Sequence, residues 1–553
     1  MGYFWDALAI LAYFVLVVGV GLASARRRGQ DMREFSVGSR QLPWWAVLAS
    51  IVAAELSAAT FLGTPGEGYS LRNFTYAQLA IGTVIARIIV AYLFIRPFYD
   101  HNVVSIYEFL RIRFGNATRN AASAVFLVTR LLASGTRLYV AAVVVVLGYE
   151  MIHGVAATDS EKIVIYGGAV FLVTILTTLY TAAGGIRAVV WTDVIQATVM
   201  GGSVVYALVS LWNGVGGWSG AQSVLNQPHD LQFYDSGIDS SQGVLTNAWN
   251  ILGSEYTIWA ALLGSVFTTM ATHGTDQDMV QRMLTAKNYH KSRLALVLSG
   301  VVDIPVALGF LFIGILLAVF YQVHPDPNLP HKNPEVFAYY IIHSLPPGAR
   351  GLLIAGVLAT AMGSLSTALN ALATSFTQDF WVPIWGRKAD PHRVVSAVRW
   401  STVGFALLLA IVGTVTAAVV IYSPKARIIP IVLGIFGYTY GSLLGIFLLG
   451  LTTKNRGSEI GNLVAMLAGF IGVAILSGLP WDLINAVRGQ SSNISHTIIV
   501  LAQNGLLHLK EGYVRPPEWL VQIEFPWRVM FGTIITYAVA ACFKRKSGDG
   551  EKS

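Results

Sequence analysis

The stretch SIVAAELSAATFLGTPGEGYS, residues 50–70, is apolar enough to enter a membrane but makes a poor continuous helix. Glu55 puts a carboxylate near its middle, and three glycines and one proline follow between residues 63 and 68. Glycine and proline weaken a helix interior, and unwound backbone is tolerated at membrane depth only where it lines a cavity. The stretch therefore predicts a broken transmembrane helix beside a ligand site.

A second stretch of the same kind, LLGSVFTTMATHGTD, covers residues 262–276 and has threonines and His273 directly before Gly274. It lies about five apolar blocks further along the chain, which fits two inverted five-helix repeats. Broken helices at corresponding places in two such halves indicate a substrate site near the bilayer midplane. The alternative is that glycine and proline are simply frequent in transmembrane helices.

The composition is that of a membrane protein with many spans. Of 553 residues, 54% are hydrophobic and 12% are charged, and the mean hydropathy is +0.60. Soluble domains average about 25% charged residues. About thirteen apolar blocks reach the roughly 20 residues that a spanning helix needs. We expect an all-α polytopic membrane domain over residues 1–546, with core repeats at about 43–212 and 251–451.

Outside the spans we expect only short elements. The loops at about 213–250 and 481–525 carry aromatic residues and short apolar runs, which predict small surface helices. Residues 547–553 form a short polar end, which predicts a disordered cytoplasmic tail.

Basic residues gather in every second loop, as at residues 26–40, 111–119, 282–293, 387–393 and 544–546, whereas residues 213–250 hold no lysine or arginine. Cytoplasmic loops retain an excess of both residues, so we expect the N-terminus outside and the C-terminus inside. This asymmetry accounts for the net charge of +8 and implies no nucleic-acid partner. The single cysteine, Cys542, excludes a disulfide framework and a cysteine-based metal site.

Residues 180–197, YTAAGGIRAVVWTDVIQA, resemble the signature of the sodium:solute symporter family, which includes sodium/glucose, sodium/monocarboxylate, sodium/iodide and sodium/proline cotransporters. Further stretches are similar to other core helices of that family, in the same order: LPWWAVLAS before residue 51, HGTDQDMVQRMLTAK at 273–287, GLLIAGVLATAMGSLSTALNALATSFTQD at 351–379 and GYTYGSLLGIFLLGL at 437–451. The resemblance implies a LeuT-type five-plus-five inverted repeat, with one helix before it and two after it.

The family builds its shared sodium site from carbonyls of the broken first core helix and from a carbonyl and hydroxyls of the eighth. The resemblance places this site at Ala53, Leu56, Thr360, Gly363 and Ser364. Family members usually have two adjacent hydroxyl residues where this chain has Gly363 and Ser364, so one ligand is missing. Either water, Thr360 or Thr367 replaces that ligand, or the affinity is lower.

Two intramembrane carboxylates are candidates for a functional role, because burying an ionisable residue at membrane depth costs free energy. Asp193 matches a carboxylate that some family members use at a second cation site or in coupling; the alternative is a gate or cap. Glu55 is unusual, because relatives commonly have an uncharged side chain there. It could add a cation ligand, take a proton, or pair with a basic substrate or with Arg87, Arg130 or Arg137.

The resemblance also implies a solute pocket. Its matching positions are Glu55, Thr60, Gln78 or its neighbour Leu79, Arg137, Thr269, Thr272 and Tyr438. Arg137 suits a substrate carboxylate, which a guanidinium binds with two parallel hydrogen bonds. Asp303 lies where sugar transporters carry a lysine nearby, a difference that argues against a sugar.

These observations favour a secondary active transporter that carries a small solute with sodium as the coupling ion, by alternating access. A small organic anion such as a monocarboxylate is the favoured solute, because of Arg130, Arg137 and the stretch TFLGTP at residues 60–65, which is similar to one in the monocarboxylate branch. The alternatives are a proton-coupled transporter of the same fold, using Glu55, Asp193 or Asp303, and a sodium/sugar or amino-acid symporter.

The sequence indicates neither an enzyme nor a sensor. No HExxH motif, GxSxG elbow, P-loop or cluster of metal ligands stands out. No cofactor beyond the sodium ion and no obligate protein partner is implied. The expected partners are the solute, sodium and the lipid bilayer of the cell membrane.

Overall fold

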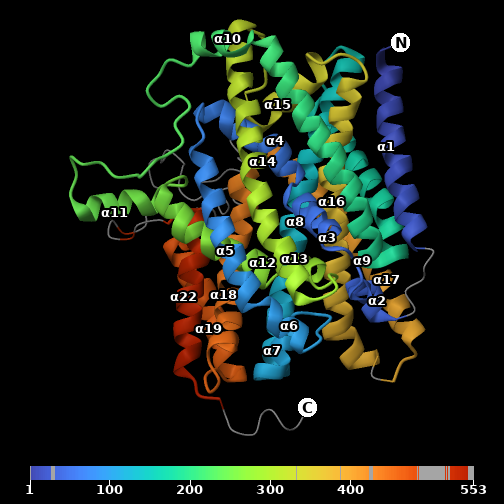
Figure 1. The fold of residues 1–553 in the computed structure, drawn as a ribbon, viewed down its shortest axis with the longest axis vertical. Coiled ribbons are helices and arrows are strands. Elements are labelled where there is room, and N and C mark those ends of the chain that lie inside the picture. Colours follow the sequence, from blue (N-terminus) through green and yellow to red (C-terminus); the bar gives the residue numbers. More distant parts are fainter. Residues whose placement is uncertain are drawn as a thin grey trace.

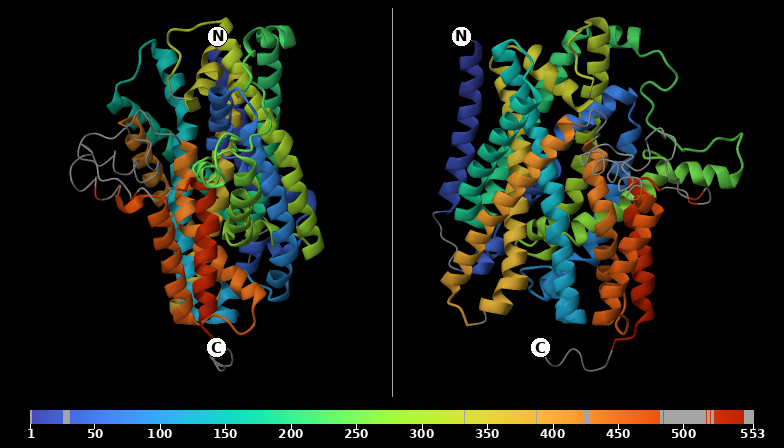
Figure 2. Two further views of the ribbon diagram at one scale, coloured as in Figure 1. Left: turned by 90° about the vertical axis from the view of Figure 1, so that its left-hand side faces the viewer. Right: turned by 180° about the vertical axis from the view of Figure 1, so that it is seen from behind.

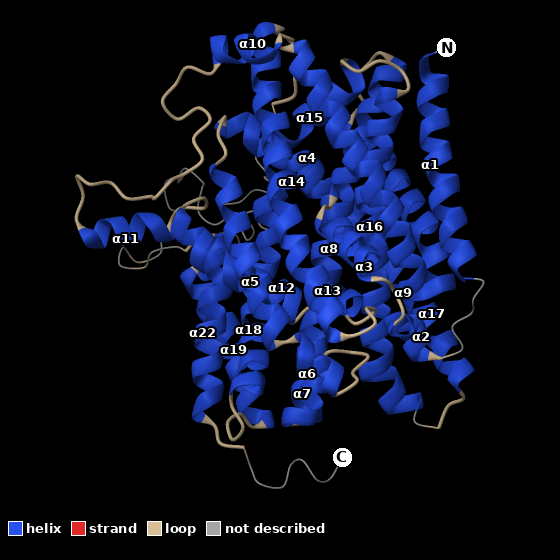
Figure 3. Cartoon of the chain, viewed as in Figure 1, coloured by secondary structure: helices blue, strands red, loops and turns tan. Residues whose placement is uncertain are grey.

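The computed structural model describes residues 2–25, 31–331, 333–386, 388–422, 428–481 and 523–545, together with Ile484, Pro517 and Leu520. Over these residues the chain is helical, and its only β-type pairings are two isolated bridges (Figure 3). The expected tail at 547–553 and most of the expected loop at 481–525 lie outside the described residues.

Nine described helical segments are long and apolar enough to cross a bilayer, and a bent pair makes a tenth. They are built on α1 (Gly2–Ala25), α5 (Leu79–Leu93), α8 (Asn116–His153), α9 (Asp159–Gly214), α14 (Tyr289–Val323), α16 (Ala349–Phe376), α17 (Pro391–Ile421), α19 (Glu459–Leu476) and α22 (Phe525–Cys542). α18 (Ile428–Thr452) is also apolar, but the structure does not describe the side chains of most residues in its first part. The total of thirteen spans remains a prediction.

α9 holds two of the predicted spans. At Gly185 the backbone leaves the helical region, with φ 57° and ψ −152°. A Cβ atom there would lie 2.4 Å from the carbonyl oxygen of Phe35, a residue of α2 (Met32–Val37). Glycine is needed at this position because it has both the conformational freedom and the small size. The break separates residues 159–184 from 186–214.

The first broken helix consists of α3 (Trp44–Glu55) and α4 (Ala58–Leu71), which bend by 60°. The break falls at Leu56 and Ser57, next to Glu55, and not at the glycines and proline of residues 63–68. Those residues are helical and pack against α14: a Cβ at Gly68 would lie 2.3 Å from the Leu311 carbonyl oxygen. Their small size serves close helix packing.

The second broken helix is η3 (Ala260–Ser265), α12 (Val266–Gly274) and α13 (Gln277–Met283). Its break covers Thr275 and Asp276, directly after Gly274 as the sequence predicts. The Asp276 carboxylate accepts a hydrogen bond of 2.8 Å from the backbone N–H of Asp278 and so caps α13.

Three groups of helices make up the molecule (Figures 1 and 2). α3, α4, α5, α12 and α14 pack together; α1, α8, α9, α16 and α17 form a second group; and α18, α19 and α22 a third. Shorter helices connect them: η2 (Thr75–Gln78), α6 (Ile95–Asp100), α7 (Tyr107–Phe114), α15 (Asn333–His343) and η4 (Thr377–Gly386). α10 (Gly217–Val224) and α11 (Val244–Leu252) are the expected surface helices.

The long axis of the molecule separates the two ends of the chain. α1 begins at one end of this axis and α22 finishes at the other (Figure 1). This arrangement agrees with termini on opposite sides of a membrane. Which end faces the cytoplasm remains a prediction from the basic residues.

Candidate functional site

Two of the expected sodium ligands meet at the break in the first core helix. The carbonyl oxygen of Ala53 lies in the last turn of α3, and that of Leu56 lies in the break itself. Opposite them is α16, where a Cβ atom at Gly363 would be 3.6 Å from the Ala53 carbonyl oxygen and 2.9 Å from Oε1 of Gln196. The structure therefore brings Ala53 and Gly363 together and adds Gln196 from α9.

Several buried polar atoms in this part of the structure make no hydrogen bond of ordinary geometry. They are Oγ of Ser364, Oδ1 of Asp193 and both amide atoms of Gln196, in side chains that are 7% exposed or less. A buried polar atom without a partner costs about 1–3 kcal/mol, so it calls for a ligand. Hydroxyl, amide, carboxylate and carbonyl oxygens suit a hard cation, and these donors fit sodium.

The remaining hydroxyls of α16 are engaged within their own helix. Thr360 Oγ1 donates to the Val357 carbonyl oxygen at 2.7 Å, and Thr367 Oγ1 donates to that of Ser364 at 2.9 Å. Gln196, which the sequence argument did not consider, fills the space where family members have the first hydroxyl side chain. A ligand role for Thr360 stays a prediction.

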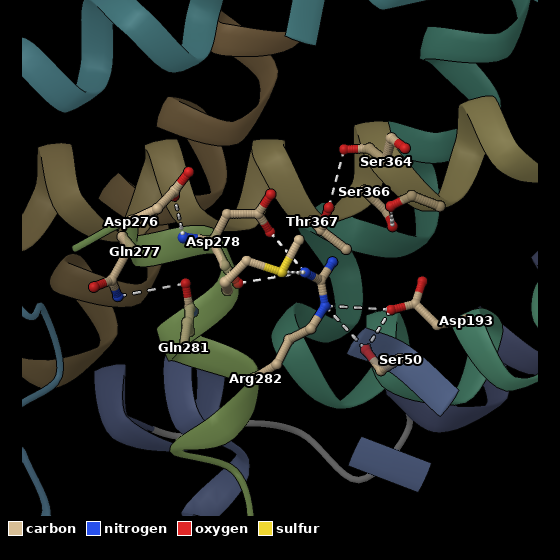
Figure 4. A network of polar contacts seen from close by, with 12 residues as sticks. Ser50, Asp193, Asp276, Gln277, Asp278, Gln281, Arg282, Ser364, Ser366 and Thr367 are labelled. Carbon is tan, nitrogen blue, oxygen red and sulfur yellow. Dashed lines mark hydrogen bonds and ion pairs between the residues drawn. The ribbon is translucent and has the colours of Figure 1, made fainter. Parts of the chain in front are cut away.

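Asp193 belongs to a buried ionic network (Figure 4). Its Oδ2 accepts a hydrogen bond of 2.5 Å from Ser50 Oγ and lies 3.6 Å from Nε of Arg282. Arg282 donates from Nε to Ser50 Oγ and from Nη1 to Asp278 Oδ1, both at 3.0 Å. Since these residues lie on α3, α9 and α13, the network joins both broken helices to α9. This placement is compatible with the predicted gate role of Asp193, and its Oδ1 makes no hydrogen bond, so both the gate role and the cation role stay predictions.

The same network continues to α8 and α18. Arg130 pairs with Asp276 at 3.0 Å and also with Asp278, and Tyr440 donates a hydrogen bond of 2.6 Å to Asp276. Together with Asp193 and Arg282, this network holds two guanidinium groups and three carboxylates. Arg137 adds a third guanidinium group that interacts electrostatically with Asp276 and Arg130.

Glu55 lies in a second network, inside the group of α3, α5, α12 and α14. Its Oε1 contacts Nη2 of Arg87 and lies 2.5 Å from Nε2 of His273. Arg87 also donates to Ser299 Oγ at 3.0 Å and lies 3.6 Å from Oδ2 of Asp303. Of the three arginines considered for Glu55, the structure selects Arg87, and Asp303 shares this partner.

Arg137 on α8 forms no ion pair among the described residues, although Asp276, which is paired with Arg130, acts on it electrostatically. Its Nε makes no hydrogen bond, and its Cζ lies over the ring of Phe436, 5.2 Å from the centroid. Arg130, two turns away, is instead saturated by Asp276 and Asp278. A guanidinium between helices at membrane depth is stable only if an anion or polar groups compensate it. Arg137 is therefore the candidate anion-binding residue.

Three predicted solute residues surround the pair of Glu55 and His273. Thr60 Oγ1 lies 3.4 Å from the Glu55 carbonyl oxygen, to which it donates. Nδ1 of His273 lies 3.0 Å from Thr272 Oγ1 and 3.2 Å from the Thr269 carbonyl oxygen. The structure thus groups these threonines around the breaks of both core helices.

Gln78, another predicted solute residue, makes its hydrogen bonds away from this group of threonines. Its Nε2 donates to the carbonyl oxygens of Thr75 and Tyr256, each at 3.2 Å, and its Oε1 accepts from the backbone N–H of Asp235 at 3.3 Å. These contacts tie the start of α5 to the loop around α11. The side chain of its neighbour Leu79 does not contribute here, although its carbonyl oxygen accepts a hydrogen bond from Ser265 Oγ.

Tyr438 also lies apart from the threonine group. Its hydroxyl accepts a hydrogen bond of 3.2 Å from Ser477 Oγ, and the guanidinium of Arg528 lies 5.4 Å from its ring centroid. These contacts are with α22 and the end of α19. Phe436 and Tyr440, two residues to either side, face Arg137 and Asp276 instead.

Sequence reasoning missed Gln196, His273 and Phe436 as site residues. Gln196 follows Asp193 by three residues in the quoted WTDVIQA, so helical spacing alone puts both on one face. His273 stands directly before the glycine at which the helix breaks. For Phe436 no signal exists in the sequence, because an apolar residue in an apolar helix is not distinctive.

Two broken helices with oxygen donors and buried ionic networks at their breaks, within an all-helical membrane bundle, define a secondary transporter of the inverted-repeat class. The solved structure of a Na⁺-coupled sialic acid symporter, in a substrate-bound outward-open state, has this fold: the TM-score is 0.75, with 97% of each chain covered and 20% sequence identity.

The chain belongs to the sodium:solute symporter family, whose model matches residues 35–469. It is 29% identical over 487 residues to sodium-coupled monocarboxylate transporter 2 of Bos taurus, covering 84% of this chain and 72% of the relative. It is 27% identical over 467 residues to the sodium/sialic acid symporter NanT of Aliivibrio fischeri, covering 83% and 86%. The chain is therefore a multi-pass membrane protein of a sodium-coupled transporter family.

Proposed function

We propose that this protein is a sodium-coupled symporter of a small organic anion, and that Arg137 binds the carboxylate of that anion. The observation that carries the proposal is that Arg137 forms no ion pair among the described residues and that its Nε makes no hydrogen bond. Arg87, Arg130, Arg282 and Arg350, by contrast, each pair with at least one carboxylate. A substrate anion would compensate Arg137.

The names of the relatives support an anionic solute. Monocarboxylates and sialic acid differ in size and polarity, but both carry one carboxylate. A guanidinium on α8 recognises this shared group, and the threonines near Glu55 and His273 supply hydrogen bonds that would distinguish one carboxylate from another. Asp303 near this site disfavours a second negative charge on the solute.

Sodium supplies the driving force in this proposal. The ion would be held by Ala53, Gln196 and Ser364, with Leu56, Thr360 and Asp193 as further candidates, between the first broken helix and α16. Sodium bound there would favour the conformation in which the break of α3 and α4 faces α16, and its loss would favour another. Only such a difference in affinity between conformations couples the sodium gradient to solute movement. The cell membrane, with Cys542 inside, is the proposed location.

A thermal-shift screen of the purified protein tests the proposal. Small monocarboxylates, sialic acid, sugars and amino acids are each tested in sodium chloride and in choline chloride. A carboxylate should raise the unfolding midpoint only when sodium is present, because the two ligands bind the same conformation. If only a sugar stabilises the protein, the proposal of an anionic solute is contradicted. Stabilisation that does not depend on sodium but varies with pH would favour proton coupling.

An Arg137→Gln variant separates the anion site from the sodium site. Its apparent affinity for the stabilising carboxylate should fall roughly tenfold or more, because a charge-assisted hydrogen bond is lost. Its response to sodium alone should be unchanged. Arg399→Gln, on α17 away from both breaks, is the matched control. Equal carboxylate affinity in wild type and Arg137→Gln would rule out Arg137.

A further inference from the structure

α11 (Val244–Leu252) exposes large apolar side chains along one side, while Ile251 and Leu252 at its end pack against the bundle. Val244, Leu245 and Trp249 are 89%, 72% and 44% exposed, and their spacing puts them on one side of the helix. On the other side Asn247 is 9% exposed and donates to the Asp239 carbonyl oxygen at 2.9 Å, and Asn250 donates to the Gln242 side chain at 2.9 Å. Large apolar side chains gathered on one exposed side of a helix suit lipid better than water.

The apolar surface extends to both sides of α11. The preceding loop exposes Phe233, Tyr234 and Ile238 by 59%, 57% and 52%. The following segment exposes Trp259, Leu262 and Leu263 by 40%, 37% and 44% as it enters the second broken helix. Exposed apolar side chains therefore continue along the chain from α11 into η3, the first part of the second broken helix.

The direction of α11 fits the surface of a membrane. The helix runs across the direction of α5 and α22 and projects sideways from the bundle, at the level where α22 begins (Figures 1 and 2). The backbone N–H of Glu524, just before α22, donates to the carbonyl oxygen of Leu252 at the end of α11, at 3.1 Å. This bond holds α11 at the depth at which a spanning helix starts.

The charges around α11 select the kind of lipid. Residues 213–250 contain no lysine or arginine, and Asp230, Asp235 and Asp239 lie in the loop before α11. Anionic lipids attract basic helices, and this segment offers them no lysine or arginine, so they have no electrostatic advantage over zwitterionic lipids here. Aromatic residues at the bilayer interface bind through apolar burial and hydrogen bonds at the headgroup level, which needs no basic charge.

We propose that α11, with Phe233, Tyr234 and Ile238, is an interfacial helix that docks into a zwitterionic lipid leaflet. On the orientation expected from the basic residues this is the outer leaflet. The docked segment is attached to the transport core, because Gln78 at the start of α5 bonds to Tyr256 and Asp235, and the Phe233 ring stacks on Phe74 at 4.5 Å. Lipid contact would therefore help to hold the start of α5 in its position.

The single native cysteine makes a direct test possible. In a Cys542→Ser background, Leu245→Cys places a polarity-sensitive fluorophore on the apolar face, and Thr246→Cys places it on the adjoining side as the matched control. Both full-length proteins are reconstituted in nanodiscs of phosphatidylcholine or of chain-brominated phosphatidylcholine. The label at position 245 should emit at shorter wavelength and lose about half its intensity in brominated lipid, whereas the label at 246 should change little.

Other occupants of this face give different results. If a second copy covers α11, the Leu245→Cys protein will form disulfide-linked dimers on oxidation and show no bromine quenching. If residues 485–516 of this chain cover it, the label at 245 will be shielded both from bromine and from aqueous iodide. Either result, or strong iodide quenching at 245, would overturn the lipid assignment. Replacing a tenth of the lipid with phosphatidylglycerol should leave the signal unchanged.

Discussion

At Gly363, where the family resemblance implies a missing sodium ligand, the structure places the amide oxygen of Gln196 from another helix. A serine there would bring a hydroxyl to the Ala53 carbonyl, and the amide oxygen of Gln196 stands in that space instead. The exchange cannot be read from either residue alone, because they are 167 positions apart and meet only through the packing of α9 on α16.

Removing the Gln196 amide should weaken sodium binding and restoring a hydroxyl should recover it. We expect Gln196→Ala to raise the sodium concentration for half-maximal thermal stabilisation roughly tenfold, since one oxygen ligand is lost. Adding Gly363→Ser should reverse most of this change, because the serine then has room. Sodium titrations at constant ionic strength with choline chloride measure the effect.

The control is Gln277→Ala, which removes a buried amide that bonds to the Val104 carbonyl oxygen and the Ile106 N–H, away from Gly363. It should lower stability without shifting the sodium midpoint. A Gln196→Ala titration that overlays that of the wild type would place the sodium ion elsewhere.

The contacts of single side chains were the feature that the sequence predicted least well. Sequence reasoning identified Asp193, Glu55 and Arg137 as charges needing partners, but which arginine meets Glu55 depends on how α5 packs against α3. Tyr438 shows a second limit. A shift of two residues in a helix rotates a side chain by about 200°, so the neighbouring Phe436 and Tyr440 face the core while Tyr438 faces α19 and α22.

Breaks in helices were predicted better, and for a physical reason. The second break follows Gly274 as expected, because a glycine next to a capping Asp276 both ends one helix and starts another. The first break lies at Leu56 and Ser57, close to the carbonyls of Ala53 and Leu56 that the family resemblance implies, and not among the glycines and proline of residues 63–68. Small residues in a membrane helix can mean unwinding or close packing, and only the neighbouring α14 shows that residues 63–68 serve packing.

The turn at Gly185 offers a test at the level of one element. Gly185→Ala should lower the free energy of unfolding by about 1–3 kcal/mol, because φ of +57° strains an alanine and the Phe35 carbonyl leaves no room for its methyl group. Gly201→Ala, in the same α9 but with nothing near its Cβ, should be neutral or slightly stabilising. Denaturation of both variants in the same detergent provides the comparison, and equal midpoints would show that the turn tolerates a side chain.

For the whole molecule, composition and hydropathy sufficed to predict an all-helical membrane bundle, and the family motifs predicted its inverted-repeat fold. The number of spans could not be settled by hydropathy, because α9 hides two spans in one helical run and α12 is too short and polar to qualify. The arrangement of the charges beside the two breaks, with Glu55 in one network and Asp193 in another, was also beyond the sequence, since each network draws on three or more helices.

The orientation is testable with the one native cysteine. Cys542 is exposed at the end of α22, and Tyr3 is 51% exposed at the start of α1. A membrane-impermeant maleimide added to intact cells should label Tyr3→Cys in a Cys542→Ser background, but should label Cys542 only after permeabilisation. Labelling of Cys542 in intact cells would reverse the orientation that the basic loops predict.

The close approach of α4 and α14 has a mechanical consequence. A Cβ at Gly314 would lie 2.0 Å from the Pro65 carbonyl oxygen, just as one at Gly68 would meet Leu311, so the two backbones interlock at two levels. Interlocked backbones cannot slide along each other without first separating. α4, the part of the first broken helix that follows the break, must therefore move together with α14 as one rigid unit that pivots at Leu56 and Ser57, next to the proposed sodium ligands.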